Sequence, residues 1–224
     1  MSERHELGRD WSFFAKMPHK SRKMPSASNW LRTMRPLAVL RTVEDFWGVF
    51  DSVRSPSNLA QNTDYCYFCD GVTPTWEDAR NAAGGKWSVS FDKEDAAGFD
   101  AAWEELCMAA IGEQLSCSND DTICGVIASS RRFEFRVAVW VSTTDTKSDT
   151  AIALVEAVSR LCGGKDVTFA AHKEGAELAA PMETKPPRRK RGSHDRHGRS
   201  ERPVEQPPAE AQHTTEVGQQ SKVK

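Results

Sequence analysis

The sequence predicts an α+β protein: a curved, mostly antiparallel β-sheet with about three helices on one face. Some segments place apolar residues at helical spacing, and others alternate them as strands do. These segments follow one another irregularly, without the spacing of βαβ units. The 224 residues, of which 38% are hydrophobic, suffice for one globular domain with a real core.

Three segments carry helical periodicity. The first begins at Thr42, a predicted N-cap that forms a variant capping box with Asp45. The second spans residues 99–112. The third spans residues 149–161 and is followed by a Gly-Gly pair in the C-cap position.

Short β-type runs predict the strands of the sheet, at residues 11–14, 65–68, 86–91, 124–128, 133–141 and 166–171. The segment 70–85 is rich in Gly, Pro, Asn and Asp, which predicts a long loop.

The strand at 133–141 has two predicted faces. Alternation assigns one face to the core, with Phe133, Phe135, Val137 and Val139. Arg136 and Trp140 then share the opposite face, separated by about 13 Å.

Charge is unevenly distributed along the chain. Residues 1–182 carry 20 Lys and Arg against 26 Asp and Glu, whereas residues 183–202 carry 8 against 3. We expect a poorly ordered segment over 1–28, a folded domain over 29–182 and a disordered, basic, Pro-rich tail over 183–224. Within the tail, the run at 185–191 is open to three interpretations: a nuclear-import signal, an anchor for RNA phosphates, or solubilising charge.

No apolar run reaches the roughly 18–20 residues that span a bilayer, and the N-terminus lacks the apolar core of a signal peptide. The six cysteines are typical of free thiols in a reducing compartment. We therefore expect the cytoplasm, and also the nucleus if the basic run acts as an import signal.

Enzymatic chemistry has little support. Cys66 and Cys69 form a CxxC spacing without a second metal-ligating pair, and alternation places them on opposite faces of a strand. Neither a Ser/His/Asp constellation nor a phosphate-binding Gly-rich loop is visible. We predict neither an enzyme nor a metal or cofactor.

The tryptophans fall into two groups. Trp47 and Trp103 lie on apolar helical stripes and Trp87 begins an alternating strand, so core packing is expected for these three. Trp30 and Trp76 lie among polar, turn-forming residues, where an indole is either a partly buried core residue or a stacking surface for a nucleobase.

Charged residues near these tryptophans are compatible with both interpretations, since Glu77 is either a solvated loop acid or a partner for a base. Glu77 directly follows Trp76, and a carboxylate can accept hydrogen bonds from guanine N1–H and its exocyclic amine. Lys86, Arg131 and Arg136 could reach phosphates in a cleft.

Several motifs together resemble the translation initiation factor 4E family. They are TVEDFW (42–47), SPSNLAQNTDYCYFCDGVTPTWED (55–78), GGKWSVSF (84–91) and IGE (111–113). The order and spacing of the tryptophans at 30, 47, 76, 87, 103 and 140 are similar to that family as well. The resemblance covers roughly residues 5–175.

The resemblance implies a sheet shaped like a cupped hand with helices on its convex back. It also implies a monomer that binds the 7-methylguanosine cap of messenger RNA between Trp30 and Trp76 and recruits a scaffold factor for translation initiation. Glu77 would bind the guanine edge, and Trp140 would lie near the N7-methyl group. Arg131 and Arg136, assisted by Lys86, would hold the phosphates.

The implied protein partner is a helical peptide of a 4G-type scaffold or of a competing repressor, docked on Val43 and Trp47. Two residues depart from the family pattern: Phe133 interrupts a basic triplet, and Glu104 stands where an apolar residue is usual. A cap-binding repressor, or an interaction module without cap binding, is the alternative.

Overall fold

The computed structural model describes residues 4–18, 33–115 and 122–172. Its core element is one seven-stranded sheet in the order β2-β1-β3-β5-β6-β4-β7, and every neighbouring pair is antiparallel. The strands are β1 (Glu6–Lys16), β2 (Met34–Thr42), β3 (Thr63–Cys69), β4 (Gly85–Asp92), β5 (Ile123–Ser130), β6 (Glu134–Val141) and β7 (Thr168–Ala171).

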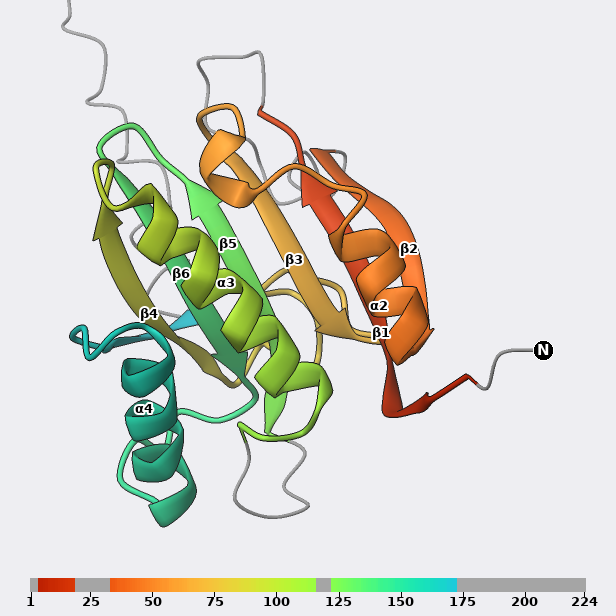
Figure 1. Ribbon diagram of the computed structural model, residues 1–224. Coiled ribbons are helices and arrows are strands. Elements are labelled where there is room, and N and C mark those ends of the chain that lie inside the picture. The colour runs from red at the N-terminus through yellow and green to blue at the C-terminus, as the bar shows by residue number, and fades with distance from the viewer. Residues whose placement is uncertain (1–3, 19–32, 116–121, 173–224) are drawn as a thin grey trace, which may run out of the picture. The chain divides into compact units, whose positions relative to one another are not determined.

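Three helices, α2 (Val43–Phe50), α3 (Ala96–Ile111) and α4 (Asp149–Leu161), lie on one face of this curved, open sheet (Figure 1). A short 3₁₀ helix, η1 (Pro56–Asn58), precedes β3. The predicted α+β class and the antiparallel sheet are confirmed. None of the described helices is long and apolar enough to cross a bilayer.

Local signals explain where the helices begin and end. The Thr42 side chain accepts from the Asp45 backbone N–H, and the Asp45 carboxylate accepts from the Thr42 N–H, so the predicted capping box is present. Helix α4 begins after Ser148, whose side chain accepts from Ala151 N–H. It ends before two glycines with φ of +71° and +76°, conformations that side chains disfavour.

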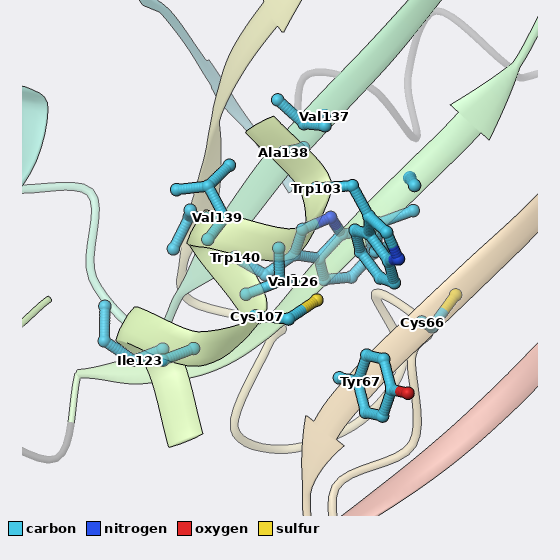
Figure 2. Close-up of a cluster of buried hydrophobic side chains, with 14 of the residues drawn as sticks. Cys66, Tyr67, Trp103, Cys107, Ile123, Val126, Val137, Ala138, Val139 and Trp140 are labelled. Atoms are coloured by element: carbon cyan, nitrogen blue, oxygen red, sulfur yellow. The ribbon is translucent and has the colours of Figure 1, made fainter. Parts of the chain in front are cut away.

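The hydrophobic core fills the space between the sheet and the helices. Tyr67 of β3 stacks with Phe13 of β1 at 4.5 Å between ring centroids and packs against Trp103 of α3 at 5.5 Å. Figure 2 shows Trp103 and Cys107 of α3 close to the valines of β5 and β6. Trp87 is buried on the same side of the sheet, beside α4.

Two segments differ from the prediction. β1 begins at Glu6 and pairs with both β2 and β3, so residues 6–16 of the segment 1–28 belong to the sheet, a longer strand than the one predicted at 11–14. β2 was not predicted, and Pro36 within it is a residue that strands disfavour. The strand order explains its presence, since β2 is an edge strand where a missing N–H is tolerated.

Phe133 is a correction to the predicted core. It is 79% exposed because β6 begins one residue later, at Glu134. Arg131 N–H donates to the Glu134 carbonyl at 3.0 Å, which closes a tight connection with Arg132 and Phe133 at its tip. Phe135, Val137 and Val139 are buried as predicted.

Candidate ligand-binding pocket on the open face of the sheet

A pocket of about 240 Å³ is lined by residues of β3, β5 and β6 that point away from the core between the sheet and the helices. This is the face of the sheet opposite the three helices of Figure 1. The floor of the pocket is formed by Cys66 of β3, Ile127 of β5 and Ala138 of β6. Aromatic and charged side chains surround this apolar floor, and they are Asp64, Trp76, Lys86, Arg131, Arg136, Trp140 and His172. Apolar walls with a few convergent polar groups are typical of small-ligand sites.

Two indoles reach the pocket from different elements. Trp140 stands on β6 and is buried, with its ring held edge-on against Phe68 at 5.5 Å and 4.0 Å from the His172 ring. Trp76 comes from the loop between β3 and β4 and is partly exposed. Trp30, the other predicted stacking residue, lies outside the described residues.

The loop that carries Trp76 and Glu77 is ordered by its own hydrogen bonds. Asn81 is fully buried, and its Nδ2 donates to the carbonyls of Thr73 at 2.8 Å and Thr75 at 2.7 Å. The side-chain amide therefore replaces the backbone partners that a strand or helix would supply. Glu77 is exposed next to Trp76 and does not line the pocket as the structure stands.

A buried carboxylate organises the cations at one end of the pocket. Asp64 is almost inaccessible and pairs with Arg131 at 2.6 Å and with Lys16 at 3.0 Å. Burial alone would raise the pKa of Asp64, but the attraction of Arg131 and Lys16 outweighs it and lowers that pKa. Arg131 also donates to the Ser129 hydroxyl at 3.2 Å, so its guanidinium is fixed.

The remaining charged groups line the same pocket. Arg136 pairs with Glu134, two residues earlier on the same face of β6. Burial, and then repulsion by Arg136 and Arg131, lower the pKa of Lys86. Burial and the nearby Lys86 lower the pKa of His172 to about 4, so the imidazole is neutral at pH 7. The pocket thus gathers three cations beside two indoles, an arrangement suited to an aromatic, phosphorylated ligand.

Sequence reasoning missed Asp64, Asn81 and His172. Asp64 could have been recognised from the sequence, because it is an acidic residue within the largely apolar run TDYCYFC. A buried carboxylate in such a strand needs a charged or hydrogen-bonding partner. His172 gave little signal because it directly follows the last predicted strand. Asn81 could not be distinguished from the other polar residues of its loop.

The predicted partner-binding residues lie on the helical face. Val43 is 38% exposed on α2, and Trp47, one turn later, is half-buried and contacts the Phe50 ring at 5.8 Å. Core packing was expected for Trp47, and it does pack against the hydrophobic core, but part of its indole remains exposed. Glu104 of α3 lines a small hollow of about 80 Å³ together with Phe50.

A larger, open hollow of about 620 Å³ lies between the C-terminal end of α4 and the N-terminal half of α3, lined by Phe91, Asp95, Arg160 and Lys165 among others. Lys165 is paired with Asp95 at 3.0 Å, and the hollow holds no pair of aromatic rings. It lacks the convergence of groups seen on the open face.

Comparison with known proteins gives a consistent result. A family model described as Eukaryotic initiation factor 4E matches residues 6–186. The "Eukaryotic translation initiation factor isoform 4E" of Nicotiana tabacum is 35% identical over 144 residues, which is 64% of this chain and 68% of that protein. The isoform 4E of Arachis hypogaea is 38% identical over 140 residues, 62% of this chain and 66% of its own length.

Solved structures agree with the sequence comparison. Ascaris suum eIF4E-3, in complex with an m7G cap, matches with a TM-score of 0.69 at 29% identity, covering 83% of this chain and 97% of that one. C. elegans eIF4E-3, in complex with the 4E-binding protein Mextli, matches with a TM-score of 0.70 at 26% identity, covering 78% and 97%.

Proposed function

This chain belongs to the eukaryotic initiation factor 4E family, and from that premise we propose that it binds the 7-methylguanosine cap of messenger RNA in the pocket on the open face. The observation that carries the proposal is the convergence of Trp76 and Trp140 with Lys86, Arg131 and Arg136. The Ascaris suum relative, solved with an m7G cap, supports the same class of ligand.

The aromatic groups would recognise the methylated base. Methylation at N7 makes guanine cationic, so stacking on Trp76, with Trp30 as the second indole, gains a cation–π contribution that unmethylated guanine lacks. Glu77, adjacent to Trp76, would accept hydrogen bonds from the N1–H and the exocyclic amine of the base. Trp140, buried against Phe68, would offer a rigid surface beside the methyl group.

The cations would hold the phosphates. Arg136 lies about 13 Å along β6 from Trp140, which matches a base at one end of the pocket and a phosphate chain at the other. Arg131 is oriented by Asp64, and Lys86 lines the same pocket. Binding requires no bond to be broken, so the protein acts as a binding factor.

The test is a titration with 7-methyl-GTP and with GTP, followed by tryptophan fluorescence. Trp76→Ala should weaken 7-methyl-GTP binding about 5- to 100-fold, the value of one base–aromatic stack. Arg136→Ala should weaken it and reduce its salt dependence. Arg160→Ala, an exposed arginine on α4, is the control for charge and should leave the affinity unchanged. Equal affinity for the two nucleotides would refute cap recognition.

We further propose that α2 recruits a scaffold factor through a helical peptide. The exposed Val43 and half-buried Trp47 offer an apolar surface one helical turn long. Glu104, beside the neighbouring hollow, favours a peptide with a basic residue at the facing position. C. elegans eIF4E-3, solved with the 4E-binding protein Mextli, supports this class of partner.

Calorimetry with a 4E-binding peptide tests this surface. Trp47→Ala should abolish binding of the peptide while 7-methyl-GTP binding persists, and Trp76→Ala should do the reverse. Glu104→Leu should weaken the binding of a peptide that has a lysine at the facing position. It should strengthen the binding of a peptide that has a leucine there. Rescue of cap-dependent translation then separates a recruiting factor from a repressor, since a repressor binds the cap without rescue.

A further inference from the structure

The tip of the β5–β6 connection presents an aromatic ring to solvent. Phe133 is 79% exposed, more than any other large hydrophobic residue that the structure describes. Single exposed apolar residues are common and need no explanation by themselves. The position of this one is informative, because the residues on both sides of the tip, Arg131 and Arg136, line the pocket.

The geometry of β6 orders the pocket and the tip along one line. Trp140 lies beside the proposed base site, and Arg136 is four residues, about 13 Å, towards the start of the strand. Phe133 is three residues beyond Arg136, at most about 10 Å further. A phosphate chain that starts at Trp140 and contacts Arg136 and Arg131 therefore leads towards the tip.

The tip has the chemistry of a stacking platform for single-stranded RNA. The Arg132 guanidinium lies 5.0 Å from the centre of the Phe133 ring, and both side chains are exposed. Aromatic rings and guanidinium planes are the surfaces on which unpaired bases stack.

The connection itself is fixed, although its tip side chains are exposed. The Arg131 N–H bond to the Glu134 carbonyl closes the connection, and Ser130 pairs with Phe135 directly behind it. The backbone of the platform is therefore ordered before any ligand arrives, which lowers the entropic cost of binding.

We propose that Phe133 and Arg132 form a stacking site for the first nucleobase that follows the cap triphosphate, so that the protein binds RNA beyond the cap itself. This inference rests on the proposed cap-binding function. The ligand class is a capped, single-stranded ribonucleotide, and the base identity is read weakly because every base offers a stacking face.

The experiment compares 7-methyl-GTP, a capped pentaribonucleotide, and the same oligonucleotide with an abasic first nucleotide after the cap. The wild-type chain should bind the capped oligonucleotide about 5- to 10-fold more tightly than its abasic form, the low end of a base–aromatic stack. Phe133→Ala should lose this difference while its affinity for 7-methyl-GTP stays within about twofold of the wild-type value. Phe133→Trp should keep or increase the difference.

Ile152→Ala is the control, because Ile152 is an exposed apolar residue on α4, away from the tip. It should leave the oligonucleotide preference intact. A Phe133→Ala variant that retains the preference would overturn this inference but not the proposed function. The same holds for a variant whose affinity for 7-methyl-GTP falls as much as its affinity for the capped oligonucleotide. A wild-type chain that fails to bind 7-methyl-GTP would overturn the proposed function and, with it, this inference.

Discussion

Replacement of Asn81 tests whether the loop that carries Trp76 is held in place by one buried amide. Asn81 is 0% exposed and follows Trp76 in the chain. It donates to the carbonyls of Thr73 and Thr75, which precede Trp76. Asn81→Ala removes both donors and leaves two carbonyls without these partners. Asn81→Asp keeps the shape of the side chain but points a carboxylate oxygen at two carbonyl oxygens.

The magnitudes follow from these contacts. Each hydrogen bond contributes about 1 kcal/mol net, and a carbonyl left buried without its donor adds to the loss, so Asn81→Ala should lower the free energy of unfolding by about 2–3 kcal/mol. Asn81→Asp should cost more, about 3 kcal/mol or above, because a buried charge then faces two acceptors. Both variants should also weaken 7-methyl-GTP binding, since Trp76 loses its fixed position.

Urea denaturation followed by tryptophan fluorescence measures the stability, and nucleotide titration measures the binding. Asn58→Asp makes the same chemical change at an exposed residue of η1 and should alter neither quantity appreciably. This role of Asn81 fails if Asn81→Ala changes stability by less than about 0.5 kcal/mol, the range of ordinary surface substitutions. It also fails if Asn81→Asp is no worse than Asn81→Ala.

Three further predictions concern charged groups of the pocket. Glu134→Gln frees Arg136 from its carboxylate partner and should tighten 7-methyl-GTP binding several-fold at low salt in a fluorescence titration; unchanged affinity would contradict a phosphate role for Arg136. Asp64→Asn should lower the free energy of unfolding by about 1–3 kcal/mol at pH 7, because Lys16 and Arg131 are then left facing each other. Because the pKa of Asp64 is lowered on folding, this stabilisation is present at neutral pH and lost as pH falls below about 4, so denaturation curves of the two proteins should converge in acid. The pKa of His172 is about 4 in the folded protein and about 6.5 in the unfolded chain. Between about pH 4 and pH 6.5 the unfolded chain therefore binds more protons than the folded protein. Wild-type Tm should therefore fall as pH drops from about 6.5 towards 4, and a His172→Gln variant that keeps the same slope would contradict this assignment.

Elements with short-range signals could be predicted from the sequence alone. The capping box at Thr42, the helical stripe that became α3 and the alternation along β6 each involve residues within a few positions of one another. Caps and periodicity act through the local backbone, so they can be recognised without knowledge of distant contacts. The arrangement of Arg136 and Trp140 on one face of a strand follows from the same local rule.

Which residues meet at the pocket depends on how the strands are ordered in space. Asp64, Lys86, Arg131 and His172 come from parts of the chain far apart in sequence, and the antiparallel sheet with its order β2-β1-β3-β5-β6-β4-β7 brings them together. The ionic partner of Arg131 and the neutral state of His172 depend on burial and on neighbouring charges, which no local pattern encodes.

Two of the departures from prediction, β2 and Phe133, have the same cause. Pro36 is acceptable in β2 only because that strand lies at the edge of the sheet, and Phe133 is exposed only because the chain reverses one residue before β6 begins. The propensities of single residues indicate which segments could form strands or enter the core. Strand order and the point at which the chain reverses depend on packing across the whole domain.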